Sequence, residues 1–470
     1  MTRTSLHDAR AALTRAVPRL RRSARVWRLT ARNGARFVVH RVRRRFAHES
    51  RRESLDDAFT LRTADDVARE LGNMKGALMK AGQLLSFIIE ALPEAAQQSL
   101  ASLYSDAPPM SPHLASGVVR DELGADPEHV FLDWSVTPIA AASVGQVHRA
   151  VTRDGRIVAV KVQYPGVGDA IEADLANADA LYRIFGAFAM KGLDTKALVD
   201  ELRSRMRDEL DYRIEARNVD EFRGLFDGHP FVALPTVVPE HSTQRVLTTD
   251  WVEGLSWAEF TAVATPAAKQ LAGESIWRFA QHAILRAGIF NGDPHPGNYR
   301  FTRDGHVTFL DFGLVKRWSP GEWELLSPSM DAIIVHRDPE RLVAAMEACG
   351  FLDAGHGLAP QAVYDYVSTP YRPYLTDTFT FTRTFMKDTV SRIIDVNGPH
   401  AEVIAKLDMP PSFVILDRVV WGVSALLGKL ELTAPWRAML LEYRIDAAPA
   451  THLGELERAW WDNRRKVQLD

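Results

Sequence analysis

The sequence predicts an α+β fold in two lobes, a small β-rich lobe followed by a larger helical lobe. Short extended segments joined by turns crowd residues 137–162, whereas the pattern after residue 249 is helical except for a single hairpin. A further helical region precedes the β-rich block. These changes of pattern divide the chain into a basic N-terminal segment, a helical extension, the β-rich lobe and the helical lobe, at residues 1–55, 56–115, 116–248 and 249–470.

The composition is that of an ordinary globular protein, but its charge is unevenly distributed. Hydrophobic residues make up 46% and charged residues 25% of the chain, and a single cysteine, Cys349, excludes a disulfide framework. Residues 1–52 hold 16 arginines against Asp8 and Glu49, a net charge of +14, so the remaining residues carry −17. This asymmetry indicates an anionic partner for the N-terminal segment.

Apolar residues lie among these arginines, a pattern typical of a basic amphipathic segment on an anionic membrane surface. A solvated tail and a transit peptide are the alternatives. Nucleic acid is not expected as a partner, because no base-reading module accompanies the arginines. No secretory signal is found, and the most apolar run, Phe413–Leu427, is interrupted by Asp417 and Arg418, which predicts a buried helix. We therefore expect a cytoplasmic protein with peripheral membrane contact and no transmembrane segment.

The helical extension contains one unusual polar pair. Thr63 is a suitable N-cap for a helix that runs toward Pro93, and Lys80 and Gln83 lie three residues apart on one face of it. Considered alone, the two are a charged surface pair with a glycine between them.

The β-rich block combines an alanine-rich turn with a lysine that ends an apolar strand. Three extended segments are predicted at 137–142, 145–151 and 157–162. The first connection reads Ala-Ala-Ala-Ser-Val-Gly over residues 140–145; alanines make it stiffer than a glycine-rich loop, and a strand-edge turn is the plain alternative. Lys161 follows Val158-Ala159-Val160, and a lysine there points inward only if an anionic group meets it.

An acidic string follows in the helical region predicted over residues 195–225. Asp211 and Glu215 lie four residues apart and are expected on one helix face, with Glu209 pointing elsewhere. A solvated acidic face is the alternative. Two more strands, at 231–234 and 245–249, are expected to complete a sheet of about five, and Asp250 to Gly254 connect the lobes.

A hairpin in the second lobe is flanked by polar groups at both ends. Strands at 298–301 and 307–310 enclose an Asp-Gly turn, and the side chains of Asp293, His295, Asn298 and Asp311 crowd the two ends. Carboxylate and amide oxygens are the ligands that Mg²⁺ shares with phosphates. Ser-Pro-Gly-Glu at 319–322 then predicts a capping box soon after Asp-Phe-Gly at 311–313, which leaves little intervening segment. The remaining pattern predicts helices at 274–287, 321–336, 339–348, 361–367, 383–396, 412–427 and 434–446.

The motifs together resemble a known family. Asp293 followed after five residues by Asn298, and then Asp-Phe-Gly, resembles the catalytic and metal loops of protein-kinase-like folds. The string DPHPGN at 293–298, with Lys-Ala-Gly-Gln at 80–83, resembles the UbiB/AarF family of atypical kinases, which serve coenzyme Q and other lipid pathways. The resemblance implies a protein-kinase-like two-lobed fold, with the N-terminal helical extension lying across a nucleotide pocket.

The resemblance also implies a role for each matching residue. Asp293 would be the general base, Lys161 would hold the α- and β-phosphates and be fixed by Glu215, and Asn298 and Asp311 would bind Mg²⁺. His295 occupies the position where ordinary kinases carry a lysine against the γ-phosphate. The other residues implied to contact the nucleotide are Ala140, Ala141, Ala142, Ser143, Gly145, Asp250, Val252, Lys80, Gln83, Glu209 and Asp211.

The predicted function is that of an ATP- and Mg²⁺-dependent atypical kinase or ATPase that acts in lipid or quinone biosynthesis or homeostasis at a membrane surface. The short segment after Asp-Phe-Gly argues against a peptide substrate, because ordinary protein kinases dock peptides on that segment. A non-catalytic nucleotide-binding scaffold or lipid-handling protein is the alternative. A small-molecule phosphotransferase of the antibiotic-resistance type shares the same metal residues, but the Lys-Ala-Gly-Gln element argues against it.

Overall fold

The computed structural model describes residues 112–142, 144–168, 204, 207–395, 398–408 and 411–467. The chain divides into two compact units. One comprises residues 1–108 and 166–189, and nearly all of it lies outside the described residues; the other, residues 109–165 and 190–470, contains the elements below. The predicted basic segment and most of the predicted helical extension therefore lie outside the described residues, and the proposed domain boundaries stay predictions.

The first lobe is built on a five-stranded antiparallel sheet. Strand β3 (Gly145–Val151) pairs along one edge with β1 (Asp133–Trp134) and β2 (Ala140–Ala141), and along the other with β4 (Ile157–Gln163), which in turn pairs with β6 (Val246–Asp250). Helix α6 (Pro112–Leu123) packs on one face, where Val158, Val160 and Val162 are fully buried. Because side chains alternate along a strand, Lys161 lies on the opposite face.

The sequence mispredicted one strand of this sheet. The short helix α7 (Pro127–Val130) precedes β1, a strand that was not predicted. The segment predicted as a strand over residues 231–234 forms β5 (Val232–Ala233), which pairs in parallel with β9 (Val307–Phe309) of the second lobe instead of joining this sheet. A local apolar run predicts an extended backbone, but it does not specify which strand will accept its hydrogen bonds.

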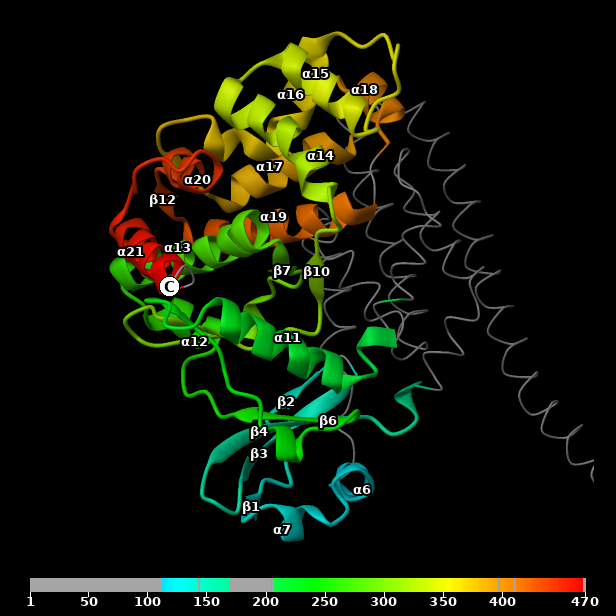
Figure 1. Cartoon of the computed structure of the whole chain (residues 1–470), viewed down its shortest axis with the longest axis vertical. Helices are drawn as coiled ribbons and strands as arrows, with labels where there is room; N and C mark the ends of the chain where they lie inside the picture. The colour runs from blue at the N-terminus through cyan, green and yellow to red at the C-terminus, as the bar shows by residue number, and fades with distance from the viewer. Residues whose placement is uncertain are drawn as a thin grey trace, which may run out of the picture. The chain divides into compact units, whose positions relative to one another are not determined.

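Helix α11 (Tyr212–Leu225) packs against β6 and separates the sheet from the second lobe (Figure 1). Asp211 is its N-cap, with extended backbone and a carboxylate that accepts a hydrogen bond from the backbone N–H of Arg213. The predicted arrangement of Asp211 and Glu215 on one helix face is therefore wrong, because the helix begins only after Asp211. An aspartate is a favoured N-cap, since its short side chain satisfies a free N–H of the first turn.

The hairpin at the centre of the second lobe is confirmed, and a second strand pair surrounds it. Strands β8 (Tyr299–Phe301) and β9 (Val307–Phe309) are antiparallel partners. Strand β7 (Ile289–Asn291), just before the predicted base loop, pairs with β10 (Val315–Arg317), just after the Asp-Phe-Gly loop. This pairing, which was not predicted, brings the start of one loop and the end of the other together.

Helices make up the rest of the second lobe, with α13 and α19 packed against each other (Figure 1). The predicted capping box at Ser319 forms only in part: the Glu322 carboxylate accepts from the Ser319 N–H at 2.8 Å, but α14 begins at Glu322, with Gly321 at φ +80° as its N-cap. The sequence did not predict α12, α18 and α21 as separate helices. The helices are α12 (Trp257–Val263), α13 (Pro266–His282), α14 (Glu322–Asp331), α15 (Pro339–Ala348), α16 (Pro360–Val367), α17 (Arg383–Ile394), α18 (Ala401–Lys406), α19 (Pro411–Leu430), α20 (Trp436–Arg444) and α21 (His452–Val467).

Shorter elements complete the connections. Two π-helical turns, η2 (Ala283–Ala287) and η4 (Ala332–His336), extend α13 and α14, and strands β11 (Phe379–Thr380) and β12 (Thr433–Ala434) pair with each other. The 3₁₀ turns are η1 (Pro239–His241), η3 (Pro296–Asn298) and η5 (Thr369–Tyr374). Within the described ranges, no helix combines the length and apolar character that crossing a membrane requires.

Candidate active site

Lys161 of β4 contacts two carboxylates, Glu215 on α11 and Asp311 in the second lobe. Its Nζ donates to both Oε atoms of Glu215, each at 2.9 Å, and lies 3.4 Å from Asp311 Oδ2. The side chains of Lys161 and Glu215 are 15% and 8% exposed, so the pair is shielded from water. The predicted pairing of Lys161 with Glu215 is thus present, and it extends to the aspartate of the Asp-Phe-Gly loop.

The charges of these three groups are strongly coupled. Burial favours the neutral amine of Lys161, but the Asp311 and Glu215 carboxylates outweigh it and raise its pKa well above the ordinary value. Burial raises the pKa of Glu215 to about 7, with Lys161 opposing the shift and Asp311 adding to it. One lysine facing two carboxylates leaves a surplus of negative charge, which is an environment suited to a cation.

Tyr212 supports Lys161 from beneath the alanine-rich turn. The Lys161 Nζ lies 5.1 Å from the centroid of its ring, within cation–π distance. A Cβ added at Gly145 would lie 2.8 Å from the Tyr212 hydroxyl and 2.2 Å from the Val162 carbonyl oxygen, so only glycine fits there. No local sequence pattern predicts this role, because Tyr212 stands within an acidic helical string.

The backbone amides of the alanine-rich turn form hydrogen bonds within the turn itself. Ala140 and Ala141 form the exposed strand β2, and Ala142 N–H donates to the Gly145 carbonyl at 2.8 Å, with the reverse bond at 3.4 Å. Two amides that a glycine-rich loop could aim at phosphates are thus used within the hairpin. The nucleotide contacts predicted for these residues stay predictions, and Ser143 lies outside the described residues.

Asp293 and Asn298 are in direct contact at the start of the hairpin. The Asn298 side-chain amide donates to the Asp293 backbone carbonyl and to Asp293 Oδ2, both at 3.0 Å. Because the NH₂ group makes these two hydrogen bonds, the side-chain oxygen of Asn298, Oδ1, has a defined direction, and it is the atom that could coordinate a metal ion. His295 turns back on its own loop, since its Nδ1 accepts from the Gly297 N–H at 3.1 Å.

Asn291, at the end of β7, ties the two functional loops together. Its side-chain amide donates to the Asp311 carbonyl oxygen at 2.6 Å, and its Oδ1 accepts from the Asp293 N–H at 2.9 Å. The Gly292 N–H also donates to the Leu314 carbonyl at 2.8 Å. The predicted base and the predicted metal ligand are therefore held on one hydrogen-bonded platform.

Arg418, from α19, forms an ion pair with Asp293. Its Nη2 donates to Asp293 Oδ1, and its side chain is 6% exposed. In the sequence, Arg418 is recognisable only as an interruption of an apolar helix. The two residues are 125 positions apart, so no local pattern connects them.

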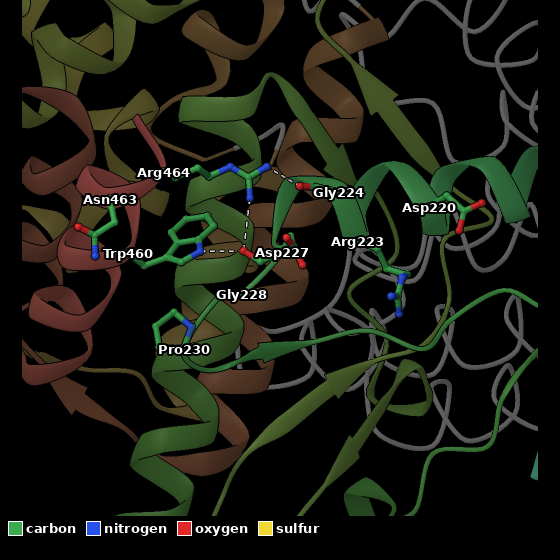
Figure 2. Close-up of a pocket in the computed structure, with 9 residues that line it drawn as sticks. All are labelled: Asp220, Arg223, Gly224, Asp227, Gly228, Pro230, Trp460, Asn463 and Arg464. Atoms are coloured by element: carbon green, nitrogen blue, oxygen red, sulfur yellow. Dashed lines mark hydrogen bonds between the residues drawn. The ribbon is translucent and has the colours of Figure 1, made fainter. Parts of the chain in front are cut away.

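Helix α11 contacts the Asp-Phe-Gly loop as well as Lys161. The Asn218 amide donates to the Phe312 carbonyl at 2.9 Å, and the Phe222 and Phe312 rings lie 4.7 Å apart. At the far end of α11, Arg464 of α21 donates to the Gly224 carbonyl, and Trp460 of α21 donates to the Asp227 carbonyl just after the helix. A cavity of about 860 Å³ lies beside these contacts (Figure 2). None of the predicted site residues lines this cavity.

The other residues predicted to contact the nucleotide form hydrogen bonds elsewhere or lie outside the described residues. The Asp250 carboxylate pairs with Arg156 at 2.6 Å, and its N–H donates to the Thr236 carbonyl, while Val252 lies in the segment after β6. The Glu209 carbonyl accepts from Gln163 at 3.3 Å. Lys80 and Gln83 lie outside the described residues, so the nucleotide contacts predicted for them stay predictions.

The donor set fits Mg²⁺ held jointly with phosphates rather than by protein alone. Within the described part of the chain, no group of three or more His, Cys, Asp and Glu side chains could hold a metal ion. Asp311, with a 35% exposed side chain, and Asn298 instead provide one carboxylate and one amide oxygen. Mg²⁺ commonly takes one or two protein ligands and completes its octahedron with water and substrate phosphates.

Comparison with known proteins identifies relatives over most of the chain. A chloroplastic protein of Arabidopsis thaliana named Activity of BC1 Complex Kinase 1 is 32% identical over 302 residues, which are 62% of this chain and 43% of the relative. A chloroplastic aarF domain-containing protein kinase of the same plant is 31% identical over 407 residues, covering 82% and 54% of the two chains. The chain thus spans about half the length of these relatives.

A solved structure and a family model also match this chain. The complex of Rv3197 with erythromycin from Mycobacterium tuberculosis has a TM-score of 0.58 and 32% identity, and the match covers 79% of this chain and 93% of that one. The family model described as the ABC1 atypical kinase-like domain matches residues 102–346. The two-lobed kinase-like fold and the motif resemblance are both confirmed, and the chain belongs to the ABC1, or UbiB/AarF, family of atypical kinase-like proteins.

Proposed function

We propose that this chain binds Mg-ATP in the cleft between its lobes and transfers the γ-phosphoryl group to a hydroxyl of a small molecule or lipid, or to water. One observation carries the proposal: Lys161 of the first lobe meets Glu215 and Asp311, while Asn291 ties Asp311 to the loop of Asp293. Phosphoryl transfer depends on positioning and charge neutralisation, and this arrangement supplies both.

Each residue has a defined part in the proposed step. Lys161, fixed by Glu215, binds the α- and β-phosphates, and Asp293 accepts the proton of the attacking hydroxyl. A bond forms between the acceptor oxygen and the γ-phosphorus while the bond from that phosphorus to the bridging oxygen breaks, and ADP leaves with the electron pair. Mg²⁺, held by Asn298 and Asp311, would offset the phosphate charge.

The acceptor is proposed to be a small molecule or lipid. Between Gly313 and α14 the chain forms only the three-residue strand β10 and a turn, which offers little surface for docking a peptide. The similar M. tuberculosis protein was solved with erythromycin, which shows that a protein of this fold binds a small molecule. The Arg-rich N-terminal segment supports work at an anionic membrane surface, where lipid or quinone-like acceptors reside.

ATP hydrolysis by purified wild-type protein tests the proposal. We expect Mg²⁺-dependent release of phosphate, stimulated by anionic vesicles, that Asp293→Asn and Asp311→Asn each reduce at least about a hundredfold. Asp304→Asn is the matched control, since this carboxylate lies exposed in the turn of the same hairpin, and it should keep wild-type activity. Full activity in both site variants, or none in the wild type, would favour the nucleotide-binding scaffold.

A panel of acceptors then distinguishes the substrate class. Labelled ATP is incubated with quinone-like and phospholipid vesicles, with erythromycin, and with buffer alone, and the label is traced to lipid, macrolide or free phosphate. Label in lipid supports lipid transfer. Label in erythromycin supports the small-molecule alternative, and label in free phosphate alone assigns water as the acceptor.

A further inference from the structure

The proposed base is held by a residue from a distant helix. Asp293 Oδ1 accepts from Arg418 of α19, and Asp293 Oδ2 accepts from Asn298 at 3.0 Å. A donor on each oxygen fixes the plane of the carboxylate.

Helix α19 is fitted closely to the loop of Asp293. Gly422 lies one turn after Arg418 on the same helix face. A Cβ added at Gly422 would lie 2.3 Å from Pro294 Cγ, so the absence of a side chain lets the helix approach the loop. Two successive positions of one helix face therefore contact two successive residues of the loop.

The Arg418 ion pair differs from an ordinary structural pair in the same lobe. Arg444, whose side chain is 8% exposed, uses Nε and Nη2 on Asp331 and Ser327. The buried Nη1 of Arg418, by contrast, has no hydrogen-bond partner among the described residues. A buried donor without a partner is costly to keep, so its presence calls for an explanation, and a catalytic role is one.

We propose that Arg418 is a positioning residue that orients Asp293 for proton transfer; this inference rests on the proposed function. The site has His295, rather than lysine, two residues after the base, and the His295 Nδ1 is occupied by the Gly297 N–H. Arg418 supplies a permanent positive charge to the same loop from outside it. It is expected to influence turnover rather than binding of Mg-ATP, because its guanidinium pairs with the proposed base and not with the lysine proposed to hold the phosphates.

The test compares Arg418→Gln, Arg418→Lys and Arg444→Gln in the full chain, by kcat and KM for ATP hydrolysis, the Kd for Mg-ATP, and Tm. We expect Arg418→Gln to lower kcat about ten- to a hundredfold, because a small displacement of a reacting group is costly to rate, with Kd changed less than about threefold. Arg418→Lys, which keeps the charge, should recover part of the loss. Arg444→Gln is expected to lower Tm similarly and leave kcat unchanged.

The outcomes separate this inference from the proposed function. Wild-type turnover with an unchanged kcat in Arg418→Gln overturns the positioning role alone. Equal losses of kcat in Arg418→Gln and Arg444→Gln also overturn it, because they would reflect general destabilisation. A wild-type protein without any ATP turnover overturns the proposed function, and the positioning role falls with it.

Discussion

At the scale of the residue, the candidate site is organised by an imbalance of charge. Lys161 faces two carboxylates, Glu215 and Asp311, in a region largely shielded from water. In such surroundings like charges repel strongly, so the group is more stable with an added cation or proton. A nucleotide that arrives with a divalent cation meets this requirement, whereas a free anionic nucleotide does not.

Replacing the lysine should therefore affect ligand binding. We expect Lys161→Ala to weaken Mg-ATP binding roughly 10- to 100-fold, since a charged hydrogen bond contributes about 1.5–3 kcal/mol. Isothermal titration calorimetry measures the effect. Lys406→Ala is the control, because Lys406 forms an i,i+4 pair with Glu402 on α18 and contacts no site residue. An unchanged Mg-ATP affinity in Lys161→Ala would contradict the assignment.

The sequence predicts those candidate-site residues that belong to a local motif. Lys161, Glu215, Asp293, Asn298 and Asp311 each belong to a short string with a characteristic spacing. Asn291, Tyr212 and Arg418 do not, because their roles depend on contacts between residues distant in sequence or on the shape of a turn. Motifs specify chemistry, whereas the groups that orient the chemistry are specified by packing.

At the scale of the element, helix α19 acts on the site through its close approach to Pro294. Gly422→Ala should raise intrinsic helix stability by about 0.5–1 kcal/mol, yet displace the loop, since the new Cβ would overlap Pro294 Cγ. We expect ATP turnover to fall at least about tenfold, because Asp293 precedes Pro294 directly. Steady-state kinetics and thermal unfolding measure the two effects.

Gly117→Ala provides the control for that substitution. Gly117 lies within α6, and a Cβ there would meet no atom within 4 Å. We expect this variant to gain a little stability and to keep wild-type turnover. If Gly422→Ala also keeps wild-type turnover, the close approach of α19 does not position the loop.

The elements were predicted unevenly, for physical reasons. Helix α15 begins and ends where the sequence placed it, because Asp338 caps it and a proline occupies its first position. Strands β7 and β10 escaped prediction because three residues give no periodic pattern, and β5 was assigned to the wrong sheet because local propensity does not choose a partner. The hairpin β8–β9 was found because its turn carries an Asp-Gly signal.

At the scale of the whole molecule, a buried polar network joins α13, α20 and α21. Arg278 of α13, whose side chain is fully buried, contacts Glu274, Glu442 and Glu457 at 2.8–3.1 Å. His282 Nδ1 lies 2.9 Å from Glu457 Oε1. Because α21 also binds the end of α11 through Trp460 and Arg464 (Figure 2), this network connects the C-terminal helix to the helix that carries Glu215.

The network should make stability depend on pH. Burial alone would raise the pKa of Glu457, but the nearby His229 and His282 and the Arg278 charge outweigh it and hold that pKa well below the ordinary 4.5. A depressed carboxyl pKa contributes stability above about 4.5 that is lost as pH falls further. We expect Glu457→Gln to flatten the dependence of Tm on pH below 4.5.

Glu455→Gln on the same helix is the matched control for that experiment. The Glu455 side chain is 69% exposed and lies 3.4 Å from His452, so its removal should leave the dependence of Tm on pH close to that of the wild type. Parallel curves for Glu457→Gln and the wild type would show that the buried carboxylate does not contribute to acid sensitivity.

The N-terminal segment is expected to bind the molecule to anionic membranes. Residues 1–52 carry a net charge of +14 and lie outside the described residues. Each arginine near an anionic surface contributes about 1 kcal/mol, and salt weakens the attraction. We expect a chain without residues 1–52 to bind anionic vesicles at least about tenfold more weakly, with binding to neutral vesicles unchanged, as measured by co-sedimentation at low and high salt. Equal partitioning of the two chains into anionic vesicles would remove the membrane role of the segment, and ATP hydrolysis without vesicles serves as the check that the shortened chain is folded.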